Sequence, residues 1–332
     1  MNFLKNSGVT IVAEIGVNHE GDLQQAKKIL QLAAEAGVDY VKFQSYTPSR
    51  YSTAQDNVRF NRITKFALKQ EDFKLLAQLA SDLGVGFFST PVTEDWVDIL
   101  DEFCPVFKIA SGDISFKPVI QKVAQKGKPF MISTGTATIE EIDQAVEWVQ
   151  QEVGTKDLKN HLILMHCVSA YPTPIDQANL LSIPFLRDRY GVRIGYSNHV
   201  IGMNACLAAV ALGAEVIEIH FTDRKDGREF RDHALSFDQN DLKTFIQISH
   251  DIRKSLGSYT KQVQPCEKDN IPMFRKGIIA ACDLKKGHVL LDNDLMFARP
   301  ATEFAASEIN ALIGKTLKVD VPKGFLIPRN AI

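Results

Sequence analysis

Two histidines and two lysines are the residues of this sequence whose surroundings most directly suggest chemistry. His199 and His220 each follow a short apolar run. Two imidazoles completed by oxygen and water ligands suit a divalent ion with open coordination positions, although sequence spacing leaves a purely structural role equally open. Lys42 and Lys108 interrupt apolar runs of the same kind, and burying a lysine is costly unless an anion compensates its charge.

Further polar residues stand at the ends of apolar runs, and eight consecutive runs end in this way. Among these residues are Glu14, Gln44, Thr90, Ser111, Ser133, Tyr171 and Ser197. Taken singly, a serine or threonine at a strand end is usually a capping or turn residue, and a lysine there can extend its ammonium group to solvent. Capping alone does not explain why eight successive apolar runs all end in polar residues. Hydroxyl donors beside two lysines predict a site for a polyanion, most simply a phosphorylated carboxylate. The sequence does not distinguish whether His19 and His233 line this site or lie in the core.

A repeating unit of strand and helix must position these residues. The predicted strands cover residues 10–16, 37–44, 84–90, 105–111, 127–134, 161–167, 191–197 and 213–220, most of them preceded by glycine. Helical periodicity follows Asp22, a predicted N-cap, and recurs at residues 71–83, 139–151, 203–212 and 239–256. Eight alternating units favour a closed (β/α)8 TIM barrel, with its active site at the carboxyl ends of the strands. An open doubly wound sheet is the alternative, but no Gly-x-Gly-x-x-Gly follows the first strand.

The pattern changes after residue 256. Residues 257–274 are largely polar and irregular and are predicted to be a linker between a barrel domain, residues 1–256, and a small β-rich domain, residues 275–332. The net charge of -2 gives no basic field for nucleic acid or an anionic membrane. The five cysteines are scattered, which favours a reducing cytoplasm, and we expect neither a signal peptide nor a membrane span.

Eight short motifs occur in order along the chain. They are residues 13–22 (AEIGVNHEGD), 41–44 (VKFQ), 89–91 (STP), 108–112 (KIASG), 133–135 (STG), 171–174 (YPTP), 195–199 (GYSNH) and 218–222 (EIHFT). Together they resemble the sialic acid synthase family, which includes N-acetylneuraminate, legionaminate and pseudaminate synthases and spore-coat polysaccharide relatives. The similarity covers nearly the whole chain, and the tail with residues 297–300 (FARP) resembles the family's antifreeze-like (SAF) domain.

The resemblance implies a role for each matched residue. The residues implied to hold phosphoenolpyruvate are Lys42, Thr90, Lys108, Ser111, Ser133 and Ser197. Those implied to face the sugar are Glu14, Gln44, Tyr171 and Asp232. His199 and His220 match the ligands of a manganese or magnesium ion. Arg299 matches an arginine that the antifreeze-like domain inserts into the neighbouring subunit's site, in a domain-swapped homodimer.

The implied reaction joins phosphoenolpyruvate to an N-acylated aldose, such as N-acetylmannosamine or a 2,4-diacetamido-trideoxyhexose, to form a nine-carbon 2-keto acid and phosphate. Glu14, His199 and His220 are the expected catalytic residues, with Glu14 handling a proton and steering water. Four departures from the family pattern occur. They are Ser169 in place of a common Asn, Asn198 in place of a common Asp, residues 227–231, which lack the usual Gly-Pro, and residues 52–62, where no Asn aligns with the one that some neuraminate synthases use for the sugar.

Two other classes of function stay open. A Schiff-base aldolase would use Lys42 or Lys108 as its nucleophile and need no metal. A non-catalytic carbohydrate-binding protein would need neither the histidine pair nor the lysines.

Overall fold

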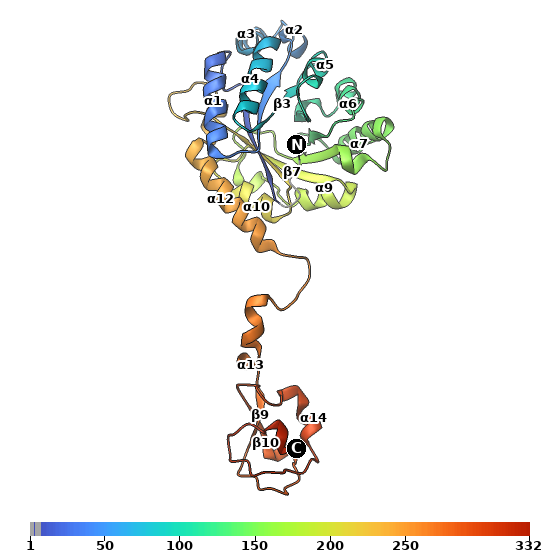
Figure 1. Cartoon of the computed structure of the whole chain (residues 1–332). Coiled ribbons are helices and arrows are strands. Elements are labelled where there is room, and N and C mark those ends of the chain that lie inside the picture. Colours follow the sequence, from blue (N-terminus) through green and yellow to red (C-terminus); the bar gives the residue numbers. More distant parts are fainter. Residues whose placement is uncertain (1–2, 4–7) are drawn as a thin grey trace. The chain divides into compact units, whose positions relative to one another are not determined.

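Eight parallel strands form the frame of the first part of the chain in the computed structural model, which describes Phe3 and residues 8–332 (Figure 1). They are β1 (Thr10–Gly16), β2 (Tyr40–Ser45), β3 (Gly86–Pro91), β4 (Phe107–Ile109), β5 (Phe130–Ser133), β6 (Leu162–His166), β7 (Arg193–Asn198) and β8 (Val216–His220). Their hydrogen-bonded order is β3-β2-β1-β8-β7-β6-β5-β4. Because β3 and β4 also lie against each other, the sheet closes on itself. The predicted (β/α)8 TIM barrel is confirmed, and the open sheet is excluded.

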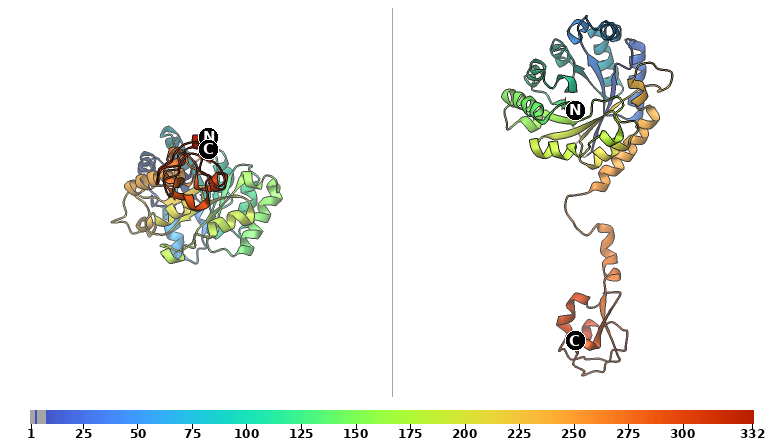
Figure 2. Two further views of the ribbon diagram at one scale, coloured as in Figure 1. Left: turned by 90° about the horizontal axis from the view of Figure 1, so that it is seen from below. Right: turned by 180° about the vertical axis from the view of Figure 1, so that it is seen from behind.

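Helices surround the strands (Figures 1 and 2). They are α1 (Leu23–Ala36), α2 (Pro48–Tyr51), α3 (Asn57–Phe66), α4 (Gln70–Asp82), α5 (Trp96–Asp101), α6 (Lys117–Ala124), α7 (Ile139–Val153), α8 (Leu158–His161), α9 (Ser182–Tyr190), α10 (Asn204–Ala211), α11 (Asp232–Leu235) and α12 (Gln239–Leu256). Two single 3-10 turns, η1 (Ser111–Asp113) and η2 (Ile175–Gln177), follow β4 and β6.

Local chemistry sets the ends of α1 as predicted. Asp22 caps the helix, because its side chain accepts hydrogen bonds from the amides of Gln24 and Gln25. Gly37 ends the helix with a φ of 93°, a left-handed conformation that a residue without a Cβ adopts at no steric cost. The strand that follows starts three residues later, so the glycine turns the chain back into the barrel.

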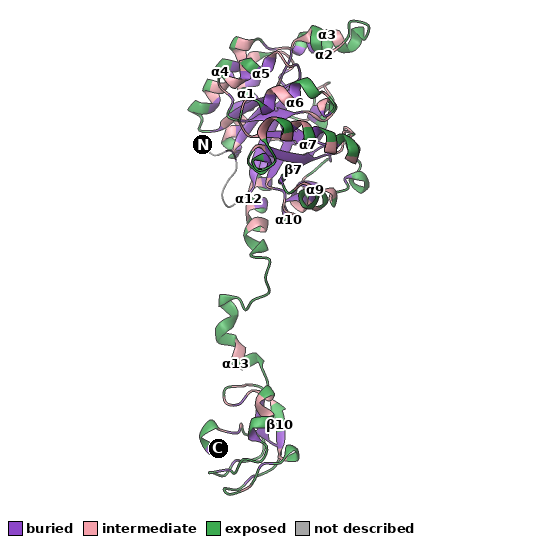
Figure 3. Ribbon diagram, turned by 90° about the vertical axis from the view of Figure 1, so that its right-hand side faces the viewer, coloured by how far each residue is buried: buried purple, intermediate pink, exposed green. Residues whose placement is uncertain are grey.

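Burial explains why the strands are apolar on both faces. Every residue of β1, β5, β6 and β8 is buried, and Figure 3 shows the strands as the buried centre of this unit. Helices cover the outer face and side chains fill the interior, so neither face contacts water. Polar side chains on these strands therefore lie inside the barrel, where they need partners or a ligand.

The structure departs from the sequence-based expectations in several helices. The segment between β2 and β3 contains α2 and α3 before the expected helix, and α5, α6 and α9 were not anticipated. These helices are short, with too few turns to show a clear apolar period. The predicted linker is irregular only at first, because residues from Pro265 form a 3-10 turn, η3 (Pro265–Asn270), and one turn of helix, α13 (Ile271–Phe274).

The rest of the chain packs around its own small core. The chain divides into two compact units, Met1–Gly257 and Ser258–Ile332. In the second unit, β9 (Gly277–Ala280) pairs antiparallel with β10 (Leu295–Ala298), and isolated bridges join Ile279 to Leu326 and Leu284 to Val321. Its remaining short turns are η4 (Asp292–Asp294), η5 (Ala306–Glu308), α14 (Ile309–Leu312) and η6 (Arg329–Ala331).

None of the helices in the described residues combines the length and apolar character needed to cross a membrane.

Candidate active site

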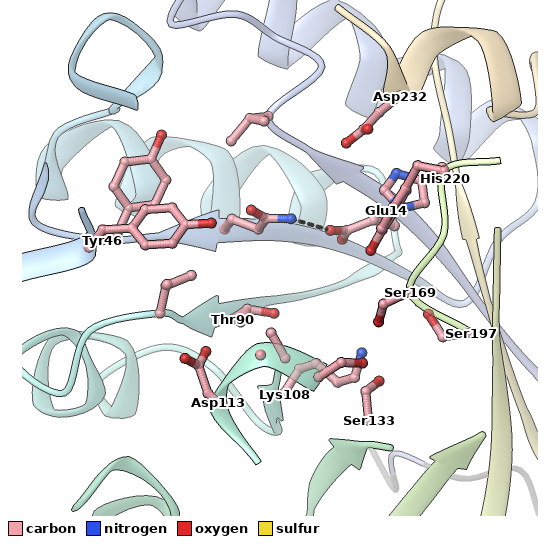
Figure 4. Close-up of a pocket in the computed structure, with 18 of the residues that line it drawn as sticks. Glu14, Tyr46, Thr90, Lys108, Asp113, Ser133, Ser169, Ser197, His220 and Asp232 are labelled. Carbon is pink, nitrogen blue, oxygen red and sulfur yellow. Dashed lines mark hydrogen bonds between the residues drawn. The ribbon is translucent and has the colours of Figure 1, made fainter. Parts of the chain in front are cut away.

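A cavity of about 710 Å³ opens at the carboxyl ends of the barrel strands (Figure 4). All eight strands, or the residues just after them, contribute to its lining. The contributors include Glu14, Lys42, Gln44, Thr90, Lys108, Ser133, Cys167, Ser197, Glu218 and His220. The closed barrel brings these ends together, which is the reason that residues distant in sequence share one cavity.

Two lysines and two carboxylates form a chain of ion pairs on the cavity floor. The ammonium group of Lys42 lies 2.7 Å from Glu14 Oε2 and 3.6 Å from Glu218 Oε1. Lys108 Nζ lies 3.0 Å from both carboxylate oxygens of Glu218. None of the four side chains belongs to a residue more than 4% exposed. The strand register contributes directly, because Glu14 and Lys42 are paired neighbours on β1 and β2.

Mutual compensation keeps Lys42 and Glu218 ionised. Burial alone would raise the pKa of Glu218, but the charges of Lys108 and Lys42 outweigh it and lower that pKa to about 2. Burial likewise disfavours the ammonium form of Lys42, and Glu14 and Glu218 together raise its pKa above the ordinary value. The four formal charges cancel, so the floor is polar and preorganised without being strongly positive.

Hydroxyl groups surround this chain, and two of them have no partner. Thr90 accepts a hydrogen bond from Lys42 at 3.2 Å, and Ser197 donates to Glu218 at 3.0 Å. The buried hydroxyl oxygens of Ser133 and Ser169 have no hydrogen-bond partner in the described structure. Buried polar atoms are rarely left unpaired, so these two hydroxyls are suited to oxygen atoms of a ligand.

Gly135 lets three polar side chains approach one point of the backbone. Its amide donates to Ser111 Oγ at 3.2 Å. A Cβ atom at this position would lie 2.3 Å from Ser169 Oγ, 2.8 Å from Ser111 Oγ and 2.9 Å from Cys167 Sγ. Only glycine at this position therefore lets Ser111, Cys167 and Ser169 lie so close to the backbone. Their hydroxyl and thiol groups add hydrogen-bond donors beside the lysines.

The histidines stand at neighbouring strand ends. The ring centroids of His199 and His220 are 5.4 Å apart, and the ring of Tyr171 lies 4.1 Å from that of His199. Burial, and then the nearby His220, lower the pKa of His199 to about 3, so its imidazole is neutral at physiological pH. A neutral ring must donate from Nδ1 to the Val168 carbonyl, which is 2.6 Å away, and this leaves Nε2 as a free lone pair.

This pair fits a divalent ion with few protein ligands. Within Phe3 and residues 8–332, no group of three or more His, Cys, Asp or Glu side chains is arranged to hold a metal. A neutral imidazole fixed through its other nitrogen is nevertheless the usual form of a histidine ligand. An ion held here would take two ligands from this chain and the others from water or substrate oxygens.

A third group of lining residues comes from β2 and from the segments that follow β6 and β8. Gln44 donates from Nε2 to Glu14 Oε1 at 3.1 Å. The guanidinium of Arg231 lies 4.7 Å from the centre of the Tyr171 ring and pairs with Asp232 at 3.2 Å. Figure 4 shows the Asp232 carboxylate on the same side of the cavity as His220. These groups provide hydrogen bonds and an aromatic surface, as sugar binding requires.

The structure brings together all of the predicted site residues except one. Those that line the cavity are Glu14, Lys42, Gln44, Thr90, Lys108, Ser111, Ser133, Tyr171, Ser197, His199, His220 and Asp232. Arg299 instead follows β10 in the second unit. His19 and His233 are buried and do not line the cavity, which settles their position.

Other lining residues were given no role in the site from the sequence. Glu218, which begins the 218–222 motif at the end of the eighth strand, is central to the charge chain, and its spacing of two residues from His220 on an inward-facing strand is the signal that could have assigned it. Arg59 and Arg62 line the cavity from α3, a helix that the sequence did not reveal. Asp113 also lines it, and burial raises its pKa to about 6.

Comparisons with known proteins follow the same division of the chain. The NeuB family model matches residues 29–261, and the SAF domain model matches residues 275–331. The N,N'-diacetyllegionaminic acid synthase of Campylobacter jejuni is 36% identical over 92% of this chain and 94% of its own. The N-acetylneuraminate-9-phosphate synthase of Homo sapiens is 31% identical over 94% of this chain and 89% of its own. The crystal structure of N-acetylneuraminic acid synthetase from Leptospira borgpetersenii, in complex with citrate, is 33% identical over 80% of this chain and 91% of its own, with a TM-score of 0.75.

Proposed function

The chain belongs to the NeuB family, and we propose that it condenses phosphoenolpyruvate with an N-acylated aldose to form a nine-carbon 2-keto acid and phosphate. The observation that carries this proposal is the cavity floor, where two buried lysines, each paired with a carboxylate, stand beside serine hydroxyls that lack partners. Such a floor suits the phosphate and carboxylate of phosphoenolpyruvate. The named activities of the relatives agree with a synthase of this kind.

Positioning is the first contribution of these residues. Lys42, Lys108 and the hydroxyls of Thr90, Ser111, Ser133 and Ser197 hold phosphoenolpyruvate, and Gln44, Tyr171 and Asp232 hold the open-chain sugar. Fixing both substrates lowers the entropic cost of their encounter. C3 of phosphoenolpyruvate then forms a bond to the aldehyde carbon, whose oxygen takes up a proton, and positive charge develops at C2.

Glu14 is the proposed proton-handling group. One of its carboxylate oxygens pairs with Lys42 and the other accepts a hydrogen bond from Gln44, so its orientation is fixed at the junction of the two substrate regions. Its negative charge stabilises the cation at C2, and it takes the proton of the water that adds there. The bond between C2 and the phosphate-bearing oxygen then breaks, and the new C2 hydroxyl group loses its proton to the departing phosphate, which leaves the 2-keto acid.

The histidine pair is the proposed site of a manganese or magnesium ion. His199 and His220 would hold it, and when bound it supplies a Lewis acid for the aldehyde of the acceptor. The neutral state of His199 and the fixed ring orientation support this assignment.

Two alternatives are less consistent with the site. A Schiff-base aldolase needs an uncharged lysine, but the pKa of Lys42 is raised and Lys108 is paired with both oxygens of Glu218. A non-catalytic carbohydrate-binding protein would have no use for a buried lysine–carboxylate chain, which is costly to desolvate.

The proposal extends to the organisation of the protein. We propose a barrel domain at residues 1–256, a linker at 257–274 and an antifreeze-like domain at 275–332. The division of the chain after Gly257 and the start of the SAF match at residue 275 support these boundaries. A cytoplasmic homodimer, in which Arg299 of one subunit completes the partner's site, remains a proposal drawn from the family resemblance.

One assay tests the function. Purified protein is incubated with phosphoenolpyruvate, Mn²⁺ and one of three acceptors: N-acetylmannosamine, its 6-phosphate, or a 2,4-diacetamido-trideoxyhexose. Phosphate release and 2-keto acid formation are measured together, and equal yields with at least one acceptor are expected. Borohydride trapping with pyruvate is the control, because covalent labelling of a lysine would identify an aldolase instead.

A further inference from the structure

We propose that Arg228 is a positioning residue for the acceptor sugar, because it fixes the loop after β8 that carries Asp232 into the cavity. The inference rests on the proposed function, since it concerns how the acceptor of that reaction is held. Arg228 does not itself line the cavity. It therefore acts through the loop and not through contact with the substrate.

The loop between β8 and α12 supplies one wall of the cavity. It covers residues 221–238 and includes α11. Its consecutive residues Phe230, Arg231 and Asp232 all line the cavity. The ring of Phe230 lies 5.4 Å from the ring of Phe66 on α3, which is also a lining residue. The path of this loop therefore decides where three neighbouring side chains of the cavity stand.

Arg228 joins this loop to the loop between β1 and α1. Its Nη2 donates to both carboxylate oxygens of Asp223, at 2.9 and 3.0 Å, and its Nη1 lies 3.6 Å from Glu20 Oε1. Lys28 of α1 also pairs with Asp223, at 3.0 Å. The side chain of Asp223 is 2% exposed and that of Arg228 is 17% exposed, so water screens the pair weakly. Burial alone would raise the pKa of Asp223, but hydrogen bonds from its neighbours, Arg228 among them, lower it.

A second contact on the same Glu20 oxygen lies just beyond the lining residues. His233 Nε2 is 3.2 Å from Glu20 Oε1, and His233 Nδ1 is 2.6 Å from Thr222 Oγ1. His233 is fully buried, and burial lowers its pKa, so the ring is neutral at physiological pH. Residues 230–232 therefore lie between two contacts that share one carboxylate, with Arg228 before them and His233 after them.

The stretch before the lining residues has few other contacts to hold it. Lys225 pairs with Asp241 of α12, but residues 226, 227 and 229 are exposed, and Gly227 has a φ of 68°. Segments with few buried contacts open at low free-energy cost. If this segment were free, the acceptor would have to order it on binding, and that entropy would be subtracted from the affinity. The groups proposed to hold phosphoenolpyruvate lie on other strands, so its binding should not depend on the loop.

The test compares the two substrates in steady-state kinetics. The unchanged protein, Arg228→Gln and Arg228→Lys are assayed with N-acetylmannosamine, its 6-phosphate and a 2,4-diacetamido-trideoxyhexose, and the acceptor with the highest kcat/KM is used throughout. Arg228→Gln should raise the KM of the acceptor roughly tenfold or more, because two charge-assisted hydrogen bonds are lost. The KM of phosphoenolpyruvate should not change. Arg228→Lys keeps the charge and should lie between Arg228→Gln and the unchanged protein.

Arg224→Gln is the matched control. Arg224 lies in the same loop, is exposed and has no ion pair within Phe3 and residues 8–332. This variant should leave both KM values unchanged. Hydrogen–deuterium exchange of residues 223–232, measured without substrate, should be faster in Arg228→Gln than in Arg224→Gln or the unchanged protein. Glu20→Gln is the second test if Arg228→Gln does not fold, and it should show the same effect to a smaller extent, because the contact between Arg228 and Glu20 is the longer one.

Two results would overturn the proposal. One is an equal rise of both KM values in Arg228→Gln and Glu20→Gln, which would show a general disturbance of the barrel. The other is unchanged exchange of residues 223–232, which would show that Arg228 does not order the loop. Failure of the proposed function has a separate signature, namely no 2-keto acid from any of the three acceptors with the unchanged protein.

Discussion

The ammonium group of Lys108 lies 3.0 Å from both carboxylate oxygens of Glu218, although 110 residues separate the two in sequence. Lys108 belongs to β4 and Glu218 to β8, which are far apart in the strand order, so this pair spans the barrel interior. Ser197 donates a hydrogen bond to the same Glu218 carboxylate at 3.0 Å, so the ion pair also orients a hydroxyl group that lines the cavity.

Lys108→Ala should reduce the use of phosphoenolpyruvate by orders of magnitude. Loss of one partner of a desolvated charge contact costs about 2–5 kcal/mol, and the variant also leaves Glu218 with one cation fewer. The KM of phosphoenolpyruvate and kcat are measured, with Lys74→Ala as the control, because Lys74 pairs with Glu102 on the surface. Near-normal kinetics in Lys108→Ala would place this lysine outside the substrate site.

Removal of divalent ions should abolish turnover. The adjacent rings of His199 and His220 at the ends of β7 and β8, together with the neutral imidazole of His199, motivate this expectation. After dialysis against EDTA, Mn²⁺ or Mg²⁺ should restore activity, and His199→Ala and His220→Ala should bind Mn²⁺ more weakly in equilibrium dialysis. Full activity in protein shown by elemental analysis to be metal-free would exclude the Lewis-acid role.

Gly135→Ala should weaken phosphoenolpyruvate binding while the barrel still folds. The new methyl group would lie 2.3 Å from Ser169 Oγ, so the serine cluster must move by a large fraction of an ångström. We expect the KM of phosphoenolpyruvate to rise at least tenfold and the KM of the sugar to change little. The double variant Gly135→Ala, Ser169→Gly removes the nearest clash and should recover part of the loss. An unchanged KM in the single variant would show that the cluster does not contact this substrate.

Stability should fall as the pH drops from 6.5 toward 4, partly because of His19. Burial lowers the pKa of His19 to about 4 from 6.5, so the unfolded chain takes up a proton before the folded one does. The stabilising difference is complete above pH 6.5 and is lost as the pH approaches 4, by about 3 kcal/mol at most. Urea unfolding at several pH values measures it. His19→Gln should show a shallower slope in this window, and an identical slope would remove His19 as a cause.

Arg299 should act in the partner's active site. This prediction rests on the resemblance of residues 297–300 to the segment that, in the family, reaches into the neighbouring subunit's site. The planar guanidinium of an arginine also suits hydrogen bonding to an acyl carbonyl or a sugar oxygen. His220→Ala and Arg299→Ala proteins should each be nearly inactive. After subunit exchange, one site in each mixed dimer combines an intact barrel with an intact arginine.

The expected recovery follows from two-fold symmetry. Random exchange makes about half of the dimers mixed, so roughly a quarter of all sites should regain activity. Exchange is verified independently with differently tagged subunits. If exchange occurs and no activity returns, Arg299 acts within its own subunit or has no role in the reaction.

The sequence by itself determined the repeating units and the chemistry at their ends. Asp22 and Gly37 mark the limits of α1 through short-range hydrogen bonding and backbone conformation, which neighbouring residues decide. The apolar runs ending in Lys42, Lys108, His199 and His220 predicted both the barrel and one shared site, because parallel strands place their carboxyl ends together. The ordered motifs also identified the family.

Only the tertiary structure decided which of these groups contact one another. The pairing of Lys108 with Glu218 depends on the closure of the barrel, and no local pattern encodes a contact across it. Which face of α3 lines the cavity likewise depends on the hydrogen bond from the hydroxyl of Tyr46, just after β2, to the Ile63 carbonyl in that helix. Periodicity reports which face of an element is apolar, whereas charge neutralisation and pKa values depend on distances that folding alone sets.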